Sequence, residues 1–266
     1  MTAWHLPRGF VEYRTHHQIW WLKADWATAV QEALAGQSAI RNPQSATSAF
    51  QTVPSLTPNT QLPTPKSGGR GTTQRIDVGA RGALIVRHYR RGGVVRHFLR
   101  DLYWDRPLRP FAELVCTDFA RQSGVPTVEV LGARVEWSVC GLYRGILITR
   151  EAEGYCTLWE WLQTQPTGTV RVAVLTTVAQ TIARLHTAGI AHADLNLTNI
   201  LVSSGNEPQA LLIDFDRARV FPGPLARRRR TRNLRRLHRS LKKLDPTGQW
   251  YAPSDLEIFC RAYHGA

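Results

Sequence analysis

Three polar side chains between residues 192 and 214 are spaced for acid–base and metal chemistry. Asp194 is followed five positions later by Asn199, and Asp214 ends an apolar run further along the chain. A carboxylate can orient an attacking hydroxyl group and accept its proton, and carboxylate and amide oxygens are ligands for Mg²⁺. The arrangement therefore predicts Asp194 as a catalytic base and Asn199 and Asp214 as magnesium ligands.

The same stretch matches the catalytic loop and the metal-binding turn of kinases. His192, Asp194 and Asn199 keep the kinase order and spacing, and Asp214-Phe215 follows a short apolar strand. Phosphoryl transfer from ATP needs this combination, because one carboxylate must face the acceptor while the metal ligands face the phosphates. We expect His192 to brace the loop by hydrogen bonding. In the alternative interpretation these Asp and Asn residues only form turns, but two motifs in the right order favour catalysis.

A second group of candidates would hold the nucleotide. Arg87 ends an apolar strand where kinases of this kind carry lysine, and its guanidinium could grip two phosphate oxygens. Glu113, on the following helix, could pair with Arg87; the alternatives are a surface arginine and a solvated carboxylate. A glycine-rich loop over the phosphates is expected at Gly69, Arg70, Gly71 and Thr72. That loop lacks the full G-x-G-x-x-G pattern, and glycines also form ordinary turns.

The segments before residue 150 are predicted to be mainly strands. Residues 10–13 form a strand-like piece, a helix is expected over residues 25–34, and the β-branched residues 83–89 indicate another strand. Residues 110–122 carry an apolar stripe at helical spacing and end before Gly124, which suits a helix C-terminus. Further strands are expected near residues 128–131, 133–137 and 143–149.

The second half of the chain is predicted to be helical around one hairpin. Helices are expected from residue 157 and over residues 170–188, and two short apolar runs at 200–202 and 210–213 flank a polar turn. The hairpin carries the catalytic candidates. Together these elements predict a two-lobed, protein-kinase-like α+β fold.

The expected boundary between the two lobes lies at residues 149 and 150. Residues 1–149 would form a β-rich nucleotide-binding lobe, and residues 150–266 a small helical catalytic lobe. Residues 41–66 are rich in Pro, Ser, Thr, Gln and Asn and poor in large apolar groups. This composition predicts a mobile polar insert in the first lobe.

The net charge of +14 is concentrated in one segment. Residues 227–243 hold eight Arg and two Lys without an acidic residue. Leucines recur at helical spacing from residue 234 on, which predicts a helix whose apolar stripe packs on the second lobe. The alternatives are a stripe that lies in lipid and a charge run that is only solvated. The stripe consists of Leu234, Leu237, Leu241 and Leu244. The basic face suits an anionic lipid surface, a multiply charged substrate or nucleic acid, and we take Arg235, Arg236 and Arg239 as candidate substrate contacts.

Several function classes are disfavoured by composition. The four cysteines lie far apart without a C-x-x-C pair, which favours reduced thiols over disulfides or a zinc site. No apolar run reaches the ~18 residues of a spanning helix, and no signal peptide is expected, so any membrane contact should be peripheral. A nucleic-acid-binding protein would leave the carboxylate motifs unexplained. An aminoglycoside- or choline-type kinase stays open, although such kinases rarely need a cationic tail.

The chain resembles the 3-deoxy-D-manno-octulosonic acid (Kdo) kinases, in the lipopolysaccharide kinase group of the protein-kinase-like superfamily. The matching motifs span residues 69–244, most of the chain. They are Gly69-Arg70-Gly71-Thr72-Thr73, Val86-Arg87-His88-Tyr89-Arg90-Arg91-Gly92-Gly93, Arg109-Pro110-Phe111-Ala112-Glu113-Leu114, His192-Ala193-Asp194-Leu195-Asn196, Leu212-Ile213-Asp214-Phe215-Asp216 and the basic segment from Asn233 to Lys243.

The resemblance implies a specific reaction and place. Such enzymes use ATP to phosphorylate the 4-hydroxyl of a Kdo sugar on a lipid A precursor, at the cytoplasmic side of the inner membrane. Carried over to this chain, Asp194 is the active-site carboxylate. We accordingly expect a peripheral, monomeric enzyme whose partners are that substrate and the anionic inner-membrane surface, and not nucleic acid.

Overall fold

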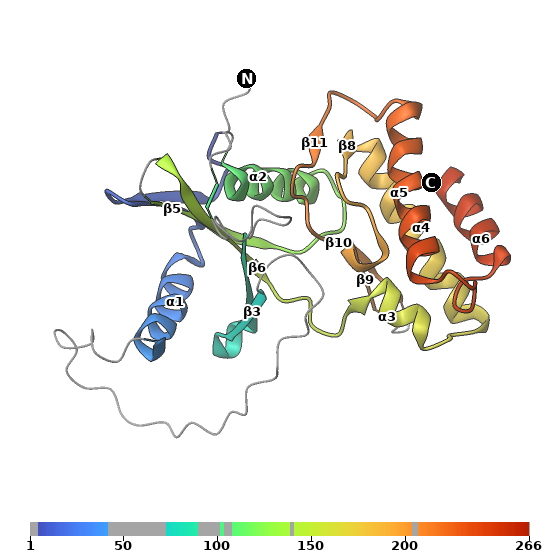
Figure 1. Cartoon of the computed structure of the whole chain (residues 1–266), viewed down its shortest axis with the longest axis horizontal. Helices are drawn as coiled ribbons and strands as arrows, with labels where there is room; N and C mark the ends of the chain where they lie inside the picture. Colours follow the sequence, from blue (N-terminus) through green and yellow to red (C-terminus); the bar gives the residue numbers. More distant parts are fainter. Residues whose placement is uncertain are drawn as a thin grey trace. The chain divides into compact units, whose positions relative to one another are not determined.

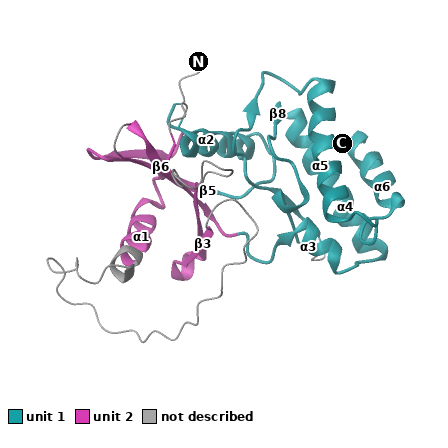
Figure 2. Cartoon of the chain, viewed as in Figure 1, with its two compact units in different colours: residues 1–7, 105–130, 152–266 teal, residues 8–104, 131–151 magenta. Residues whose placement is uncertain are grey.

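The chain divides into two compact units, which Figure 2 shows in different colours. Unit 1 consists of residues 1–7, 105–130 and 152–266, and unit 2 of residues 8–104 and 131–151. The computed structural model describes residues 5–41, 73–89, 102–103, 108–138, 141–203 and 207–265. The expected insert at 41–66, except Arg41, and the candidate loop at 69–72 lie outside the described residues.

Unit 2 is built on a six-stranded sheet in the order β1-β2-β5-β6-β4-β3 (Figure 1). Every strand pair whose register is described is antiparallel. The strands are β1 (Phe10–Arg14), β2 (Gln18–Lys23), β3 (Thr73–Asp77), β4 (Ala83–His88), β5 (Val130–Trp137) and β6 (Tyr143–Arg150). A short 3₁₀ turn, η2 (Gly79–Arg81), joins β3 to β4. The predicted strands at 10–13, 83–89 and 143–149 are therefore confirmed.

The strands expected at 128–131 and 133–137 form a single strand, β5. Gly132 lies inside this strand and has a specific role there. A Cβ atom there would lie 2.5 Å from the Leu22 side chain and 2.7 Å from the carbonyl oxygen of Trp21. Gly132 therefore allows β2 to approach β5 closely, and a glycine inside a strand often marks such an approach.

The core of unit 2 lies between the sheet and helix α1 (Ala27–Arg41). Trp26 and Val30 pack against sheet residues such as Leu22, Leu84 and Ile148, all of which are buried. Burying a large apolar side chain contributes about 1.5–3 kcal/mol, so this cluster holds the helix on the sheet. The helix predicted over residues 25–34 is confirmed and extends further.

Unit 1 is mainly helical, as predicted for the second half of the chain. Its helices there are α3 (Leu158–Gln163), α4 (Gly168–Thr187), α5 (Arg227–Leu244) and α6 (Pro253–His264). The hairpin is present as β9 (Ile200–Val202) and β10 (Ala210–Leu212), with β7 (Cys156–Thr157) pairing alongside β9. A separate pair joins β8 (Ile190–Ala191) to β11 (Arg219–Val220). Helix α6, for which no prediction was made, packs on α4.

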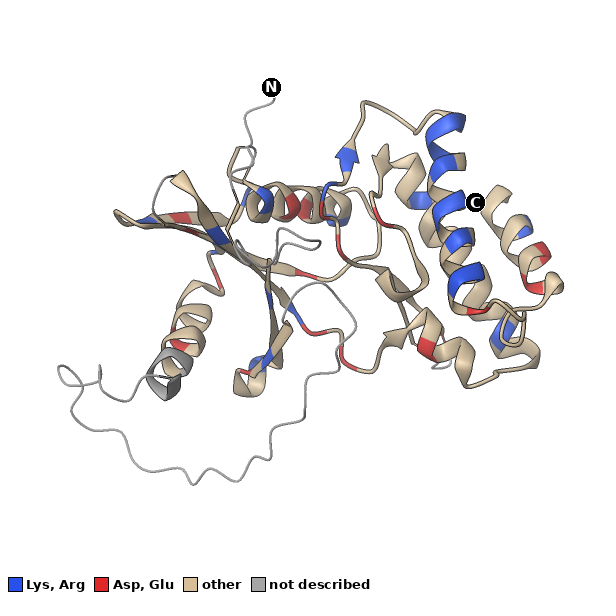
Figure 3. Cartoon of the chain, viewed as in Figure 1, with Lys and Arg blue, Asp and Glu red and all other residues tan. Residues whose placement is uncertain are grey.

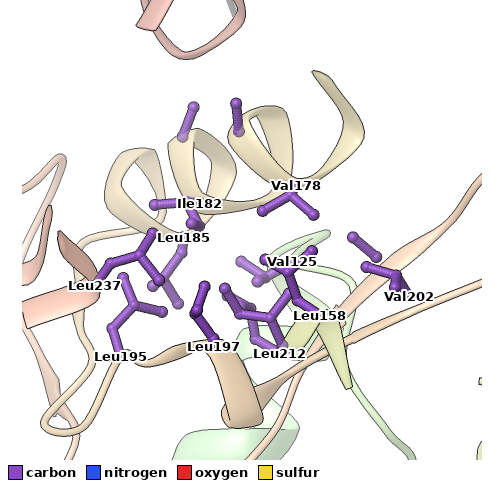
Figure 4. Close-up of a cluster of buried hydrophobic side chains, with 14 of the residues drawn as sticks. Val125, Leu158, Val178, Ile182, Leu185, Leu195, Leu197, Val202, Leu212 and Leu237 are labelled. Atoms are coloured by element: carbon purple, nitrogen blue, oxygen red, sulfur yellow. The ribbon is translucent and has the colours of Figure 1, made fainter. Parts of the chain in front are cut away.

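The core of unit 1 contains apolar side chains from the hairpin, from the loop between β8 and β9, and from the helices (Figure 4). Leu195 and Leu197 lie there beside Leu237 of α5, while Val178 and Ile182 reach the cluster from α4. The loop that carries the catalytic candidates is therefore anchored in the core through alternate leucines, while its polar residues stay outside it.

Helix α2 (Arg109–Gln122) belongs to unit 1, although residues 1–149 were expected to form one lobe. Its Cys116 and Ala120, with Val125, lie in the same core as α4. Thr127 then donates a hydrogen bond of 2.6 Å to the carbonyl oxygen of Leu212. The apolar stripe of α2 predicted a helix correctly, but a stripe alone does not determine which core the helix enters.

Candidate active site

The catalytic candidates in unit 1 occupy the loop between β8 and β9. The loop ends in a short 3₁₀ turn, η5 (Leu197–Asn199), capped by the side chain of Asn196. The Oδ1 atom of Asn196 accepts hydrogen bonds from the backbone N–H groups of Thr198 and Asn199, both at 2.9 Å. Such a cap satisfies backbone donors that would otherwise lack a partner, so it fixes the backbone at Asn199.

His192 connects the loop to the strand that leads to Asp214. Its ring is fully buried, with Nε2 3.0 Å from the carbonyl oxygen of Ile213 and Nδ1 3.2 Å from the backbone nitrogen of Asp194. Since a carbonyl can only accept and an N–H can only donate, Nε2 carries the proton and Nδ1 accepts. His192 therefore braces the loop, as predicted.

The electrostatics of His192 agree with a neutral ring. Burial lowers the pKa of His192 below its ordinary value, and the hydrogen bond to Ile213 and the charges of Asp214 and Asp194 oppose that shift. Both carboxylates thus act on one imidazole. Because the neutral ring offers one donor and one acceptor, it can serve the two backbone partners at once.

Asn199 lies close to Asp194 and to the end of β10. Its side-chain Nδ2 donates a 2.9 Å hydrogen bond to the backbone carbonyl oxygen of Asp194. The backbone carbonyl oxygen of Asn199 accepts from the backbone N–H of Ile213 at 3.0 Å. The donor end of the amide is therefore directed at the loop, which leaves the oxygen as the atom able to meet a cation. Asp194 is exposed, and Asn199 and Asp214 are half-buried.

Asp214 begins a turn with an uncommon backbone conformation. Asp214 has φ 64° and Arg217 has φ 57°, both in the left-handed region that residues other than glycine rarely adopt. Between them, Phe215 is buried and its ring lies 5.2 Å from that of His192. Asp216 pairs with Arg109 at the start of α2, and its Oδ1 accepts from Nε at 3.1 Å. The contact between Phe215 and His192 and the pair of Asp216 with Arg109 therefore fix the turn that positions Asp214.

Helix α5 contacts the loop between β8 and β9, called the catalytic loop below, through polar side chains. Asn233 accepts from the backbone N–H of His192 at 3.0 Å and donates to its carbonyl oxygen at 2.7 Å. Arg236 donates to the same carbonyl at 3.3 Å, and Ser240 accepts from the N–H of Leu197 at 3.3 Å. The basic helix is therefore part of the scaffold of the loop.

The opposite face of α5 is cationic and exposed, and Lys and Arg occur along its whole length (Figure 3). The leucine stripe packs against the core of unit 1, as predicted, with Leu237 buried. Of the candidate substrate contacts, Arg235 and Arg239 are exposed, whereas Arg236 is half-buried at the loop. The exposed cations of α5, called the basic face below, are Arg227, Arg228, Arg229, Arg232, Arg235, Arg239, Lys242 and Lys243.

The nucleotide-binding candidates are distributed over both units. Arg87 lies on β4 in unit 2, where its guanidinium stands 5.0 Å from the centre of the Tyr89 ring. Glu113 is a buried residue of α2 in unit 1. The predicted pair between Arg87 and Glu113 would join residues of different units and stays a prediction. Residues 69–72 lie outside the described part of the chain.

Comparison with known proteins gives the family. The pattern of the lipopolysaccharide kinase (Kdo/WaaP) family matches residues 62–263. The chain belongs to this family. The match covers the catalytic loop, the turn at Asp214 and the basic helix α5, so all three are parts of a Kdo/WaaP family member.

Relatives within the Kdo/WaaP family carry a common name. A 3-deoxy-D-manno-octulosonic acid kinase of Xanthomonas axonopodis pv. citri is 39% identical over 181 residues, which cover 67% of this chain and 69% of that protein. The protein of the same name from Mannheimia succiniciproducens is 36% identical over 183 residues (66% and 73%). That from Actinobacillus succinogenes is 34% identical over 204 residues (73% and 82%).

A solved structure supports the fold. The structure described as WaaP in complex with acyl carrier protein matches with a TM-score of 0.52 and 18% identity, over 76% of this chain and 77% of that chain. At this identity the likeness concerns the fold alone. It confirms the protein-kinase-like α+β fold predicted for this Kdo/WaaP family member.

Sequence reasoning missed two groups at this Kdo/WaaP family site. Asn233 was included in a basic segment, although its position beside the leucine stripe was a signal that it is buried. The pair of Arg109 and Asp216 joins residues 107 positions apart, and no local pattern links them. Both groups act on the backbone around the predicted residues.

Proposed function

We propose that this protein is an ATP-dependent 3-deoxy-D-manno-octulosonic acid kinase that phosphorylates the 4-hydroxyl of a Kdo sugar on a lipid A precursor in lipopolysaccharide core biosynthesis. Family membership and the shared name of the relatives support the reaction. The main structural support is the local network in which His192 and Asn199 bind the backbone at Asp194 and Ile213.

In this proposal Asp194 accepts the proton of the sugar hydroxyl. An exposed carboxylate on a braced loop can approach an acceptor and orient its hydroxyl group. The bond to the γ-phosphorus then forms as the bond to the β-phosphate oxygen breaks, and ADP leaves. Asp194 thus supplies orientation and a proton acceptor.

Asn199 and Asp214 would hold Mg²⁺ on the nucleotide phosphates. The donor set fits this ion, because Asn199 directs its amide nitrogen at the loop and Asp214 supplies a carboxylate. Among the described residues no cluster of three or more His, Cys, Asp or Glu side chains could hold a metal. Magnesium suits two protein ligands, since it usually keeps waters and shares substrate phosphates. When bound, it neutralises charge on the phosphates.

The basic face of α5 would bind the acidic substrate and the anionic inner-membrane surface. Each Lys or Arg beside such a surface contributes about 1 kcal/mol. No helix in the described part of the chain has the length and apolar character to span a membrane. We accordingly propose a peripheral monomer on the cytoplasmic side, with Arg235 and Arg239 facing the substrate phosphates and Arg236 serving both substrate and loop.

The test of the reaction is mass spectrometry of Kdo–lipid IVA after incubation with the protein and Mg-ATP. We expect a gain of one phosphate, abolished in Asp194→Asn. The matched control is Glu257→Gln, which changes an exposed carboxylate of α6 in the same unit in the same way. Phosphate transfer to an aminoglycoside in place of Kdo–lipid IVA would refute the proposed substrate.

The test of the surface is sedimentation with anionic vesicles. Charge reversal of Arg235 and Arg239 should weaken binding at least ~30-fold, because two contacts of about 1 kcal/mol each are lost. Reversal of Arg184 and Arg261, which are exposed on α4 and α6, is the control for net charge. Equal losses in both variants would contradict a role for the basic face.

A further inference from the structure

The side chain of Asn233 forms hydrogen bonds with both backbone polar groups of one residue of the catalytic loop, His192. It is 1% exposed, yet it lies on the most basic helix of the chain. Its Nδ2 donates to the carbonyl oxygen of His192 at 2.7 Å, and its Oδ1 accepts from the N–H of the same residue at 3.0 Å. An amide can satisfy both groups at once, as a neighbouring strand would.

The orientation of the Asn233 amide follows from its other neighbour. Nε2 of His186 lies 3.3 Å from Oδ1, and Nδ1 of His186 lies 2.7 Å from the hydroxyl of Tyr263. With Oδ1 as acceptor, His186 donates through Nε2 and accepts from Tyr263 through Nδ1. Burial lowers the pKa of His186 to about 4, so this ring is neutral at pH 7. Each donor then meets an acceptor: the Tyr263 hydroxyl donates to His186, His186 donates to Asn233, and Asn233 donates to the carbonyl oxygen of His192.

The residue that Asn233 holds is the one that joins the two halves of the site. The His192 ring reaches the backbone of Asp194 at 3.2 Å and of Ile213, next to Asp214, at 3.0 Å. A shift of the His192 backbone would therefore move both the proton acceptor and the strand end that carries a proposed metal ligand. Asn233 touches none of the reacting groups itself.

We propose that Asn233 is a positioning residue, which sets the place of Asp194 through the backbone and ring of His192. This inference rests on the proposed kinase function, in which Asp194 accepts the hydroxyl proton. It also gives α5 a second purpose, because the helix that bears the basic face fixes the catalytic loop from its inner side.

The consequence of losing the amide can be sized from catalysis in general. A misplacement of about 1 Å can reduce the rate about 100-fold without loss of substrate binding. Asn233→Asp keeps the shape but puts a carboxylate oxygen opposite the His192 carbonyl, where a donor is needed. We expect kcat to fall about 10- to 100-fold, with KM for ATP changed less than threefold.

The experiment compares Asn233→Asp and Asn233→Ser with Tyr263→Phe. The control removes the hydroxyl that binds His186 at the far end of the same buried network, and it leaves both bonds to His192 in place. We expect kcat of Tyr263→Phe within about threefold of the unmodified protein. Should Asn233→Asp fail to fold, the smaller Asn233→Ser carries the comparison, since the shorter serine side chain cannot place polar atoms where both the amide oxygen and the amide nitrogen of Asn233 lie.

Amide hydrogen exchange provides a readout that does not depend on the substrate. The two hydrogen bonds from Asn233 to the backbone of His192 are called the clamp here. Loss of the clamp should raise the exchange rate in a peptide covering residues 190–200 at least tenfold, and leave the rate in a peptide of α4 unchanged. This arm separates the two hypotheses: absence of Kdo–lipid phosphorylation in the unmodified protein refutes the proposed function, while unchanged exchange refutes the clamp. Equal kcat losses in Asn233→Ser and Tyr263→Phe, or a loss confined to KM, would also overturn the positioning role.

Discussion

The pair of Arg109 and Asp216 joins helix α2 to the turn that begins with Asp214. The Arg109 and Asp216 side chains are 17% and 20% exposed, so neither charge is fully solvated. Both Nε and a terminal nitrogen of Arg109 bind the carboxylate. Two-point contact between a guanidinium and a carboxylate is among the stronger ion pairs in proteins.

The strength of this pair can be worked from its exposure. Exposed pairs contribute about 0.2–1 kcal/mol, and hydrogen bonds to charged groups about 1.5–3 kcal/mol. A pair with about one fifth of its side-chain surface exposed should lie between these limits, at about 1–2 kcal/mol. Because it is only partly exposed, 0.5 M salt should weaken it less than a surface pair.

The assay is a double-mutant cycle with Arg109→Met, Asp216→Asn and the double variant, followed by urea unfolding. The cycle isolates the pair because any other contact of Arg109 is lost equally in both backgrounds. Fluorescence and circular dichroism should give coincident transitions, so that one free energy of unfolding is defined. Additive effects of the two substitutions, within about 0.3 kcal/mol, would refute the reasoning.

Three further predictions follow from local geometry. Gly189→Ala should lower the free energy of unfolding by at least about 2 kcal/mol, because φ is +76° and a Cβ would lie 2.4 Å from two backbone carbonyl oxygens. Gly79→Ala, where φ is +66° and nothing lies near the added Cβ, should lower the free energy of unfolding by only about 1 kcal/mol. Thermal unfolding of both variants measures the difference, and equal losses would contradict a steric contribution at Gly189. The folded-state pKa of His186 lies at about 4, below its ordinary 6.5, so the unfolded chain binds more protons and stability should fall as the pH drops from about 6.5 towards 4. That loss of stability is about 2 kcal/mol at pH 5 relative to pH 8. With the free energy of unfolding measured in urea at each pH, His186→Gln should make it depend less on pH, and an unchanged pH dependence would exclude His186 as its source. Asn199→Ala should raise the Mg²⁺ concentration for half-maximal phosphate transfer about tenfold or more, and an unchanged requirement would argue against Asn199 as a ligand.

The elements with a regular apolar period were predictable from the sequence. Helix α4, strand β4 and the hairpin of β9 and β10 each follow from a local pattern of apolar residues and turn residues. Strand β5 was predicted as two strands, on either side of Gly132. The need for glycine at this position comes from the close approach of β2, a partner more than a hundred positions away in the chain.

The site was predictable to the extent that it is local. His192, Asp194, Asn199 and Asp214 lie within one stretch that a hairpin folds back on itself, so spacing alone brings them together. The groups that hold this stretch come from α2 and α5. Sequence spacing cannot show which side chains of a distant helix reach a loop, because that depends on how the helix packs.

The composition of unit 1 affects how the protein can be divided and made. Its core takes Cys116, Ala120 and Val125 from a segment that precedes β5 and β6, while its remaining members follow residue 151. A fragment starting at residue 150 would therefore expose an apolar surface meant for α2. During translation α2 leaves the ribosome before α4 exists, so this part of the core can close only after more than fifty further residues have been added. Independent production of unit 1 would require a rearranged chain in which residues 105–130 are linked directly to residues 152–266.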